Sequence, residues 1–484
     1  MKRIIRCICL LLICVIMTGS LTSCVAIFLI PPFSQLPASV ILARSQSYYE
    51  EGQVAEHEIN IELTGTQNGN KMQITSHTTQ SESYLDQGAQ GYEYRNVITT
   101  EGTDAYGSVD KRETTEGYAN GYMYMSYQPI KGTEMGSAYR HKSPLKAEEY
   151  REFLEAREEE SQMMVPEDEF GEVTYRFGGL GKTLTVICDD YLQPKNSAFD
   201  EMLQGMAASS PVAMKVKQLH LEMEFDSLRQ AQTEERLQVE LVATDGSEWT
   251  IKVDAHAVLS RPEEGSTWAP ADFDTYEETT DLRQRYELLD QMNELMRSEG
   301  VQIYQKTSLS VKSNSGSASG QQNVSYHFGV RDGVFQYIAT SVDKAGTVQT
   351  RIRYDGEKKI TEEKGAEAKT EEQSQAAAKR FVEDCLSDFF YDPHRITQSA
   401  EIIDNRTGNR TLVLTHQVDR QTRQQLSAYG LNGADLSQVR VTTTIVWTKD
   451  GAISMISSGI SYNKKAVFLN YSTQLTGFVE TPIG

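Results

Sequence analysis

The chain of 484 residues carries a formal net charge of −21, with 68 acidic and 47 basic residues. This length is enough for two or three domains. No basic patch stands out that would neutralise phosphates, which argues against nucleic acid as a partner and against a second, polybasic attachment to anionic lipid. The acidity itself is typical of a surface that keeps a protein soluble.

The first residues have the layout of a secretory signal, in which a basic start precedes a charge-free apolar run beginning at Cys7. The run ends at Leu21-Thr22-Ser23-Cys24, which resembles a bacterial lipobox. The resemblance implies that the Cys24 thiol is acylated and that Cys24 becomes the mature N-terminus. We therefore predict a signal peptide over residues 1–23, a membrane tether over 24–53, and a protein anchored to the lipid bilayer through acylated Cys24 on the extracytoplasmic face.

An uncleaved transmembrane helix is the alternative to the lipobox. Apolar, charge-free sequence continues past Cys24 to Ile30, and Cys7–Ile30 is long enough to span a bilayer, which takes about 20 residues. Both interpretations place the basic start inside the cell and the rest of the chain outside.

From residue 54, apolar residues recur at every second position, a period typical of half-buried antiparallel strands. Asn68-Gly69 predicts a hairpin turn between the first two strands. Helices are expected over 145–159 and 197–206. Further strands are expected at 92–99, 117–127, 173–177, 183–188, 219–225, 237–241 and 249–255.

Residues 261–280 contain turn-forming proline and glycine residues and are expected to form a linker. An amphipathic helix is predicted over Asp281–Arg297, and a charged, low-complexity stretch over 361–374 leads into an alanine-rich helix through Phe389. Strands are expected between these helices at Val301–Val311, Asn323–Val330, Phe335–Val342 and Thr347–Tyr354.

The second half repeats features of the first. Thr183–Val186 corresponds to Thr411–Leu414, and each half ends in a hairpin with a tryptophan beside an Asp-Gly turn: Trp249 in one and Trp447 in the other. We predict an α+β fold of two related units, residues 54–260 and 281–484. Each unit is expected to be a curved, mostly antiparallel half-barrel packed by one or two helices.

This element order behind a lipobox resembles the LolA/LppX-like half-barrel lipoproteins. The resemblance implies a half-open barrel whose apolar mouth accepts an acyl chain or another apolar ligand. Tyrosines and methionines suit such a mouth because they give adaptable apolar contact. The candidate mouth residues are Tyr118, Tyr122, Met123, Tyr124 and Met125, for which the core of a sheet is the ordinary interpretation.

The sequence offers little evidence of catalysis. Gly178–Thr183 ends like a phosphate-binding loop, but the expected earlier glycine is Arg176 and a strand pattern follows instead of a helix. The histidines form no HExxH motif, although His220 and His256 fall in neighbouring predicted strands and could meet across a sheet. Cys188 and Cys385 are expected to be buried thiols, with a disulfide between them as the alternative. We predict no catalytic residue, metal site or cofactor.

The sequence thus predicts a non-enzymatic, membrane-anchored lipoprotein that binds an apolar or amphiphilic ligand or an envelope protein. A structural or interaction protein with closed cores is one alternative, and a cell-wall hydrolase is another.

Overall fold

The computed structural model describes residues 44–45, 47–67, 69–86, 91–103, 107–132, 137–158, 169–178, 182–193, 203, 212, 214–244, 246–263, 265–313, 316–343, 345–373, 375–418, 422, 426–431, 434–464 and 467–483. The predicted signal peptide, Cys24 and most of the predicted tether lie outside these residues. Most of the helix expected over 197–206 does so as well.

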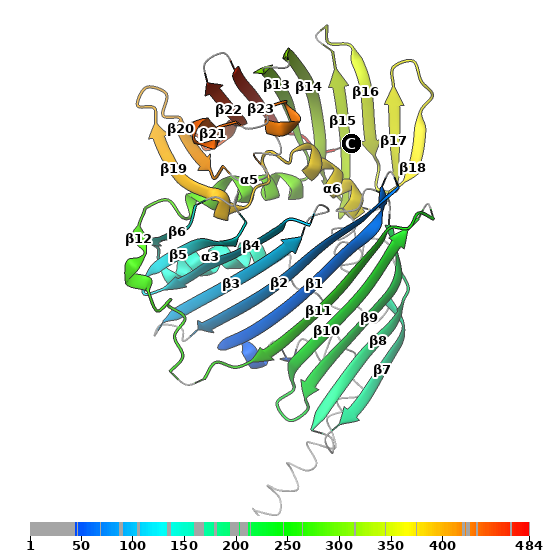
Figure 1. Ribbon diagram of the computed structural model, residues 1–484, viewed down its shortest axis with the longest axis vertical. Helices are drawn as coiled ribbons and strands as arrows, with labels where there is room; N and C mark the ends of the chain where they lie inside the picture. The colour runs from blue at the N-terminus through cyan, green and yellow to red at the C-terminus, as the bar shows by residue number, and fades with distance from the viewer. Residues whose placement is uncertain are drawn as a thin grey trace, which may run out of the picture.

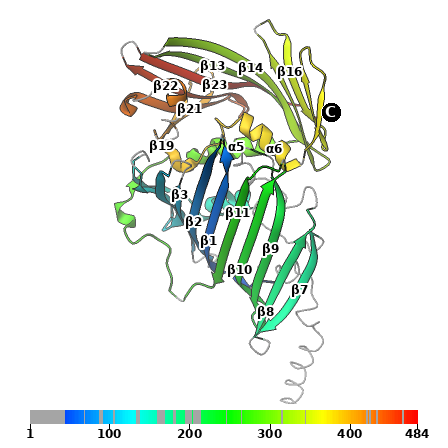
Figure 2. The ribbon, with the colours of Figure 1, turned by 45° about the vertical axis from the view of Figure 1, so that its right-hand side comes forward.

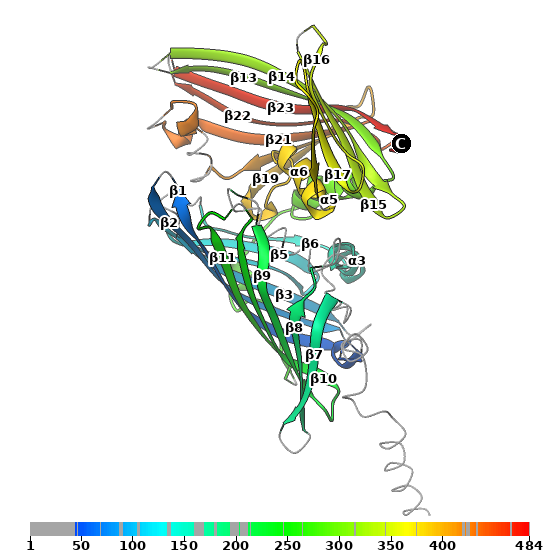
Figure 3. The ribbon, with the colours of Figure 1, turned by 90° about the vertical axis from the view of Figure 1, so that its right-hand side faces the viewer.

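Two large, mostly antiparallel sheets lie one above the other along the long axis of the molecule (Figure 1). The lower sheet has 12 strands and the upper sheet 11, and both are strongly twisted. The expected sheet-dominated fold of two units is confirmed. The same sheets seen from the side show that the upper one arches over its helices (Figures 2 and 3).

The first unit is built from long strands and the α-helix α3. Its elements are β1 (Gly52–Gln67), β2 (Asn70–Asp86), β3 (Tyr92–Thr103), β4 (Val109–Ala119), β5 (Tyr122–Lys131), β6 (Tyr139–Pro144), α3 (Ala147–Glu158), β7 (Phe170–Gly178), β8 (Thr183–Tyr191), β9 (Met214–Asp226), β10 (Ala231–Ala243) and β11 (Thr250–Ser260). The predicted linker then contributes η5 (Phe273–Thr275) and β12 (Glu277–Glu278), and β12 joins the edge of the first sheet beside β6.

The second unit follows a 14-residue helix, α5 (Gln284–Arg297). Its elements are β13 (Val301–Ser313), β14 (Gly316–Arg331), β15 (Val334–Val342), β16 (Val348–Tyr354), β17 (Lys358–Glu363), β18 (Lys369–Glu372), α6 (Gln375–Cys385), η6 (Pro393–Arg395), β19 (Ile396–Ile403), β20 (Arg410–His416), η7 (Leu436–Gln438), β21 (Val439–Trp447), β22 (Ile453–Lys464) and β23 (Val467–Glu480).

Both sheets have the same strand order apart from the short β12. In the first, β1–β6 form a meander, α3 follows, β7–β11 form a second meander, and β11 pairs with β1. In the second, β13–β18, α6 and β19–β23 repeat this plan, and β23 pairs with β13. Thr183–Val186 in β8 and Thr411–Leu414 in β20 therefore occupy equivalent strands.

The two tryptophan hairpins, by contrast, are not equivalent. Trp249 precedes β11, the last strand of its unit, whereas Trp447 ends β21, the third strand from the end of the other. Both tryptophan side chains are buried in the core of their own unit. The shared feature is therefore a large core residue beside a turn, and the two residues do not occupy equivalent strands.

The single strand expected over residues 117–127 is wrong. Asn120 and Gly121 have φ values of 54° and 81° and separate β4 from β5. Asn-Gly accepts the positive φ angles of a tight hairpin turn, so a turn interrupts the run of tyrosines and methionines. The charged stretch over 361–374 also holds more structure than expected, because it contains part of β17 and all of β18.

Helix α5 packs against both units. Leu282, just before the helix, and Tyr286 join the cluster formed by α3 and strands β3–β5 of the first unit. Leu288, Met292 and Met296 belong instead to the core of the second sheet. Burial of each large apolar side chain contributes roughly 1.5–3 kcal/mol, so α5 holds the two units together through two of its faces.

Polar groups complete the contact between the units. Arg285 is 1% exposed; its guanidinium donates to Ile396 O at 2.7 Å and reaches Asp281 at 3.3 Å and His141 Nδ1 at 3.0 Å. Asp281 also accepts the backbone N–H of Ser399 at 2.9 Å. Ile396 and Ser399 lie in β19, the last strand of the upper sheet, so these bonds cover part of its open edge.

Candidate functional site

The residues proposed from sequence as a ligand mouth lie mostly in the core. Met123, Tyr124 and Met125 are fully buried, Tyr118 is nearly so, and Tyr122 is half-buried. The hairpin of β4 and β5 brings all five residues together. Successive side chains of β5 point to opposite faces of the sheet, however, so Met123 and Met125 belong to one cluster and Tyr124 to another.

Tyr118, Met123 and Met125 pack against α3, with the Tyr118 ring stacked on Tyr150 at 5.1 Å between centroids. Tyr124 packs on the other side of the strand, edge-on to Phe273 and Tyr276. Its hydroxyl donates to Trp268 O at 3.0 Å, and burial raises its pKa well above the usual value.

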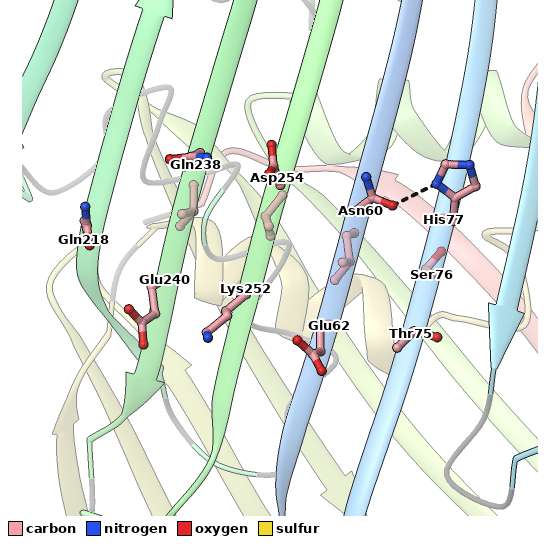
Figure 4. Close-up of a pocket in the computed structure, with 13 residues that line it drawn as sticks. Asn60, Glu62, Thr75, Ser76, His77, Gln218, Gln238, Glu240, Lys252 and Asp254 are labelled. Atoms are coloured by element: carbon pink, nitrogen blue, oxygen red, sulfur yellow. Dashed lines mark hydrogen bonds between the residues drawn. The ribbon is translucent and has the colours of Figure 1, made fainter.

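A different surface of the first unit forms a trough of about 560 Å³ (Figure 4). It crosses five neighbouring strands in the order β9, β10, β11, β1 and β2. Most of the side chains that line it are polar. They alternate along each strand with the apolar residues that face the core. In β1, for example, Ile61 and Leu63 pack in the core, and Asn60 and Glu62 point into the trough.

The trough side chains form two ladders across the sheet. Strand pairing places Gln238, Asp254, Asn60 and His77 side by side in the first ladder. The second ladder contains Gln218, Glu240, Lys252, Glu62 and Thr75. Adjacent strands lie about 4.8 Å apart, so a five-strand ladder extends over roughly 20 Å.

Acidic groups outnumber basic ones along these ladders. Glu62, Glu240 and Asp254 contribute three carboxylates, and Lys252 contributes the one ammonium group of the trough lining. Lys252 stands between Glu240 and Glu62 in the strand register. Oriented carboxylate and amide oxygens across a sheet suit a ligand that donates several hydrogen bonds and carries positive charge.

Some trough groups already have partners within the protein. Glu62 accepts a bond from Gln73 at 2.6 Å, Glu240 pairs with Lys217 at 3.0 Å, and Asn60 lies 2.8 Å from His77 Nδ1. For Lys252 and Asp254, the described residues supply neither a hydrogen bond nor an ion pair. These two groups are thus the most available for a ligand.

The corresponding face of the second unit has a different chemistry. Strand order makes β22, β23, β13 and β14 equivalent to β10, β11, β1 and β2. Their outward ladder contains Ser457, Gln474, Lys306 and Asn323, and the next contains Gly459, Ser472, Ser308 and Gln321. Neither ladder carries a carboxylate, so the acidic trough is a feature of the first unit.

A second cavity, of about 910 Å³, lies where the turns of the upper sheet meet the start of α6. Its polar groups hold these turns in place. Asp355 accepts the backbone N–H groups of Glu357 and Lys358, and the Gln375 side chain accepts the N–H of Phe335 at 3.0 Å. This arrangement has an evident structural role, and we place the candidate functional site in the trough.

The two histidines that could have met across a sheet do not do so. His220 in β9 and His256 in β11 are separated by β10, and each has its own carboxylate partner. His220 Nδ1 lies 2.7 Å from Asp189, and His256 Nε2 lies 2.7 Å from Glu234. Within the described ranges, no three His, Cys, Asp or Glu side chains are arranged to hold a metal ion.

Other sequence features have simpler outcomes. Gly178 ends β7 and pairs with Thr183, the first residue of β8, so a strand rather than a helix follows the glycine-rich sequence. Cys188 and Cys385 are not joined in a disulfide; Cys188 is buried as expected, whereas Cys385 is half-buried. In the part of the chain that the structure describes, no helix is both long and apolar enough to cross a membrane.

The trough residues were not singled out from the sequence. The alternation of polar and apolar residues predicts that these side chains point away from the core in each strand. It did not give the pairing of β1 with β11, which joins the two meanders and brings Glu62 beside Lys252. That pairing links positions almost 200 residues apart, for which a single sequence has no signal.

No protein-family model matches the chain. No curated protein matches it either. Among solved structures, the chain is similar to an AttH-type protein from Nitrosomonas europaea, with 6% identity, 88% of this chain and 93% of that chain covered, and a TM-score of 0.14.

Two further solved structures have comparable scores. Transferrin-binding protein B from Haemophilus parasuis, as a double mutant, shows 7% identity over 89% of this chain and 78% of that chain, with a TM-score of 0.15. A β-barrel-like protein from Brucella abortus shows 12% identity over 43% of this chain and 98% of that chain, with a TM-score of 0.13. TM-scores this low do not establish a shared fold.

Proposed function

We propose that this chain is an extracytoplasmic, non-enzymatic binding protein, held at the cell membrane by a lipid on Cys24, whose trough binds a basic, extended segment of an envelope protein. The observation that carries the proposal is the pair of polar ladders across β9, β10, β11, β1 and β2. A partner that lies across these ladders meets three carboxylates on the consecutive strands β10, β11 and β1, over roughly 10 Å. That spacing suits several lysine or arginine side chains on one extended segment.

The membrane anchor rests on the lipobox, Leu21-Thr22-Ser23-Cys24. Replacing Cys24 with Ala should release the protein from the membrane fraction and remove the mass of the lipid from the mature chain. Retention in the membrane with an unchanged mass would instead support an uncleaved helix over Cys7–Ile30.

Related half-barrel units remain part of the proposal. The shared strand order supports an origin of the two units by duplication of a LolA/LppX-like half-barrel. In such a history, one copy gained the carboxylates of the trough. The equivalent positions in the other copy kept serine, glutamine and lysine.

The proposal favours a polar ligand over the apolar one that the half-barrel resemblance implies. The tyrosines and methionines expected at an apolar mouth pack against α3 and η5. Burial leaves four of these five side chains no contact area for a ligand unless the helices move, and the half-buried Tyr122 lies edge-on to Phe273 of η5. The trough needs no such movement, because Asp254 is already exposed and Glu62 and Glu240 are half-exposed.

Fluorescence anisotropy of a labelled oligolysine peptide tests the trough. We expect Glu62→Gln combined with Glu240→Gln to weaken binding about tenfold, since exposed ion pairs contribute roughly 0.2–1 kcal/mol each and about 1.4 kcal/mol is a factor of ten. Glu367→Gln combined with Glu371→Gln removes the same charge from the exposed surface of the second unit and is the matched control. Equal weakening by both double variants would show that only net charge attracts the peptide.

A further inference from the structure

The lower end of the first sheet bears two exposed apolar side chains at neighbouring hairpin tips. Leu228, in the turn between β9 and β10, is 84% exposed, and Phe177, near the end of β7, is 49% exposed. The backbone N–H of Ser227 donates to Lys182 O at 2.9 Å, so the two hairpins are joined at their tips. Figures 1, 2 and 3 all place the β7–β8 hairpin at the end of the first unit farthest from the second.

The turn that carries Leu228 is held in a fixed shape. Asp226 Oδ1 accepts the backbone N–H groups of Leu228 at 2.9 Å and Arg229 at 3.1 Å. Gln230 closes the turn with a φ of 53°. Leu228 therefore projects from a bonded turn into solvent, where an apolar side chain gains nothing by itself.

Basic side chains surround these apolar residues. Arg176, Lys182 and Arg229 are exposed at the same tips. Asp226 pairs with Arg229 at 3.7 Å, and Glu224 lies level with Arg176 two strands away. The three basic side chains form a local cationic group in a chain whose net charge is −21. Its members come from separate places in the sequence, which is why no basic segment was apparent there.

The chain enters the described structure at this same end. Ser45 Oγ accepts the backbone N–H of Gln232 at 2.6 Å, and the hydroxyl of Tyr49 donates to Gln232 O at 2.6 Å. Gln232 lies two positions after the end of the Leu228 turn. Residues 25–43 are thus the only link between this tip and Cys24.

We propose that the tip formed by residues 176–178, 182–183 and 226–230 is a second membrane contact, which inserts Leu228 and Phe177 into the surface of the bilayer that holds the Cys24 lipid. This inference rests on the proposed anchoring. Apolar side chains that enter the boundary of the acyl chains, with arginine and lysine at the level of anionic headgroups, are the usual elements of interfacial binding. The second unit then points away from the membrane.

Quenching by brominated lipid tests the tip on the full, acylated chain. Leu228→Trp places a reporter in the tip, and Val348→Trp places one at another exposed apolar position (47%) in β16 of the second unit. The chains are reconstituted on vesicles of brominated phosphatidylcholine and phosphatidylglycerol, and the emission of the native tryptophans is subtracted. We expect loss of emission and a blue shift for Leu228→Trp and no change for Val348→Trp.

The outcomes separate the tip from the anchor. Flotation of the protein with vesicles without quenching of Leu228→Trp would overturn the tip and leave the anchor in place. Failure to float would overturn both. An unquenched reporter in a particle with the mass of two chains would show that the tip contacts a second copy, and would also overturn the proposal. Weaker quenching on vesicles without phosphatidylglycerol would support a role of the basic side chains in binding anionic headgroups.

Discussion

Gly117 lies in β4 where the backbone of β3 and the ring of Tyr124 leave no room for a side chain. A Cβ atom at this position would overlap Tyr94 O and Tyr124 Oη. We expect Gly117→Ala to lower the free energy of unfolding by about 1–3 kcal/mol, the usual cost of overpacking a filled core.

Gly102→Ala is the matched control for Gly117→Ala. Gly102 lies in β3, and its nearest contact would be Thr75 O at an ordinary 3.8 Å. Urea unfolding of both variants measures the difference. Equal stability of the two would show that Tyr124 is not packed as described, and would return it to the candidate ligand mouth.

His416 makes the stability of the second unit depend on pH. It is buried beside Thr443, with Nε2 2.9 Å from Thr443 Oγ1, and burial, with a further effect from Arg395, lowers its pKa from 6.5 to about 4. Between these pKa values the unfolded chain binds a proton that the folded chain does not. The free energy of unfolding should therefore fall as the pH drops from 6.5 towards 4.

Urea unfolding at pH 7 and pH 5 measures this contribution. The pKa shift corresponds to a loss of about 2 kcal/mol between these two pH values. His416→Gln keeps a group that can bond to Thr443 and cannot titrate in this range, so we expect the variant to lose less stability on acidification. The same loss in both proteins would contradict the assignment.

At the scale of elements, α5 is the part of the fold on which the arrangement of the two units depends most. Arg285→Ala leaves Asp281 without its buried cation, and breaking a buried pair in this way costs about 3–5 kcal/mol. It also removes the bonds to β19 that cover its open edge. We expect the variant to unfold at lower urea concentration and to show a larger radius of gyration by X-ray scattering.

Arg380→Ala on α6 provides the comparison. Arg380 is 52% exposed and pairs with Asp384 on the same helix, an interaction of roughly 0.3–0.5 kcal/mol. If Arg285→Ala were no more disruptive than Arg380→Ala, the contact between the units would not depend on the buried ion pair.

The elements themselves could largely be predicted from the sequence. Alternation located most long strands because one face of each is buried, as in β1 with Ile59, Ile61 and Leu63. Asn120-Gly121 could have divided the strand expected over 117–127, since Asn-Gly is the pair that a tight hairpin turn favours. β17 is mostly half-buried and β18 is exposed, and both are rich in charged residues, so they carry no clear hydrophobic alternation.

The arrangement of these elements could not be predicted in the same way. The role of α5 depends on which residues meet Leu282 and Tyr286, and these belong to a different unit. The trough depends on the pairing of β1 with β11, and the basic tip depends on a bond between two hairpins. In each case the signal is a contact between distant segments, which residue type and spacing do not record.

On the scale of the whole molecule, the two proposed contacts lie at different parts of the first unit. The tip is at the lower ends of β7–β10, where the chain arrives from Cys24. The trough lies near the opposite ends of β9 and β10, beside Gln218 and Glu240. A protein held at the bilayer by its tip would therefore keep the trough open to a partner.

The position of a bound basic segment tests this account most directly. Oligolysine is mixed with the full chain, joined to nearby carboxylates by a zero-length carbodiimide reagent, and mapped by mass spectrometry. We predict that Glu62, Glu240 and Asp254 are the joined positions, because they are the carboxylates that line the trough. Joining spread evenly over exposed acidic residues elsewhere, such as Glu367 and Glu371, would contradict a binding site in the trough.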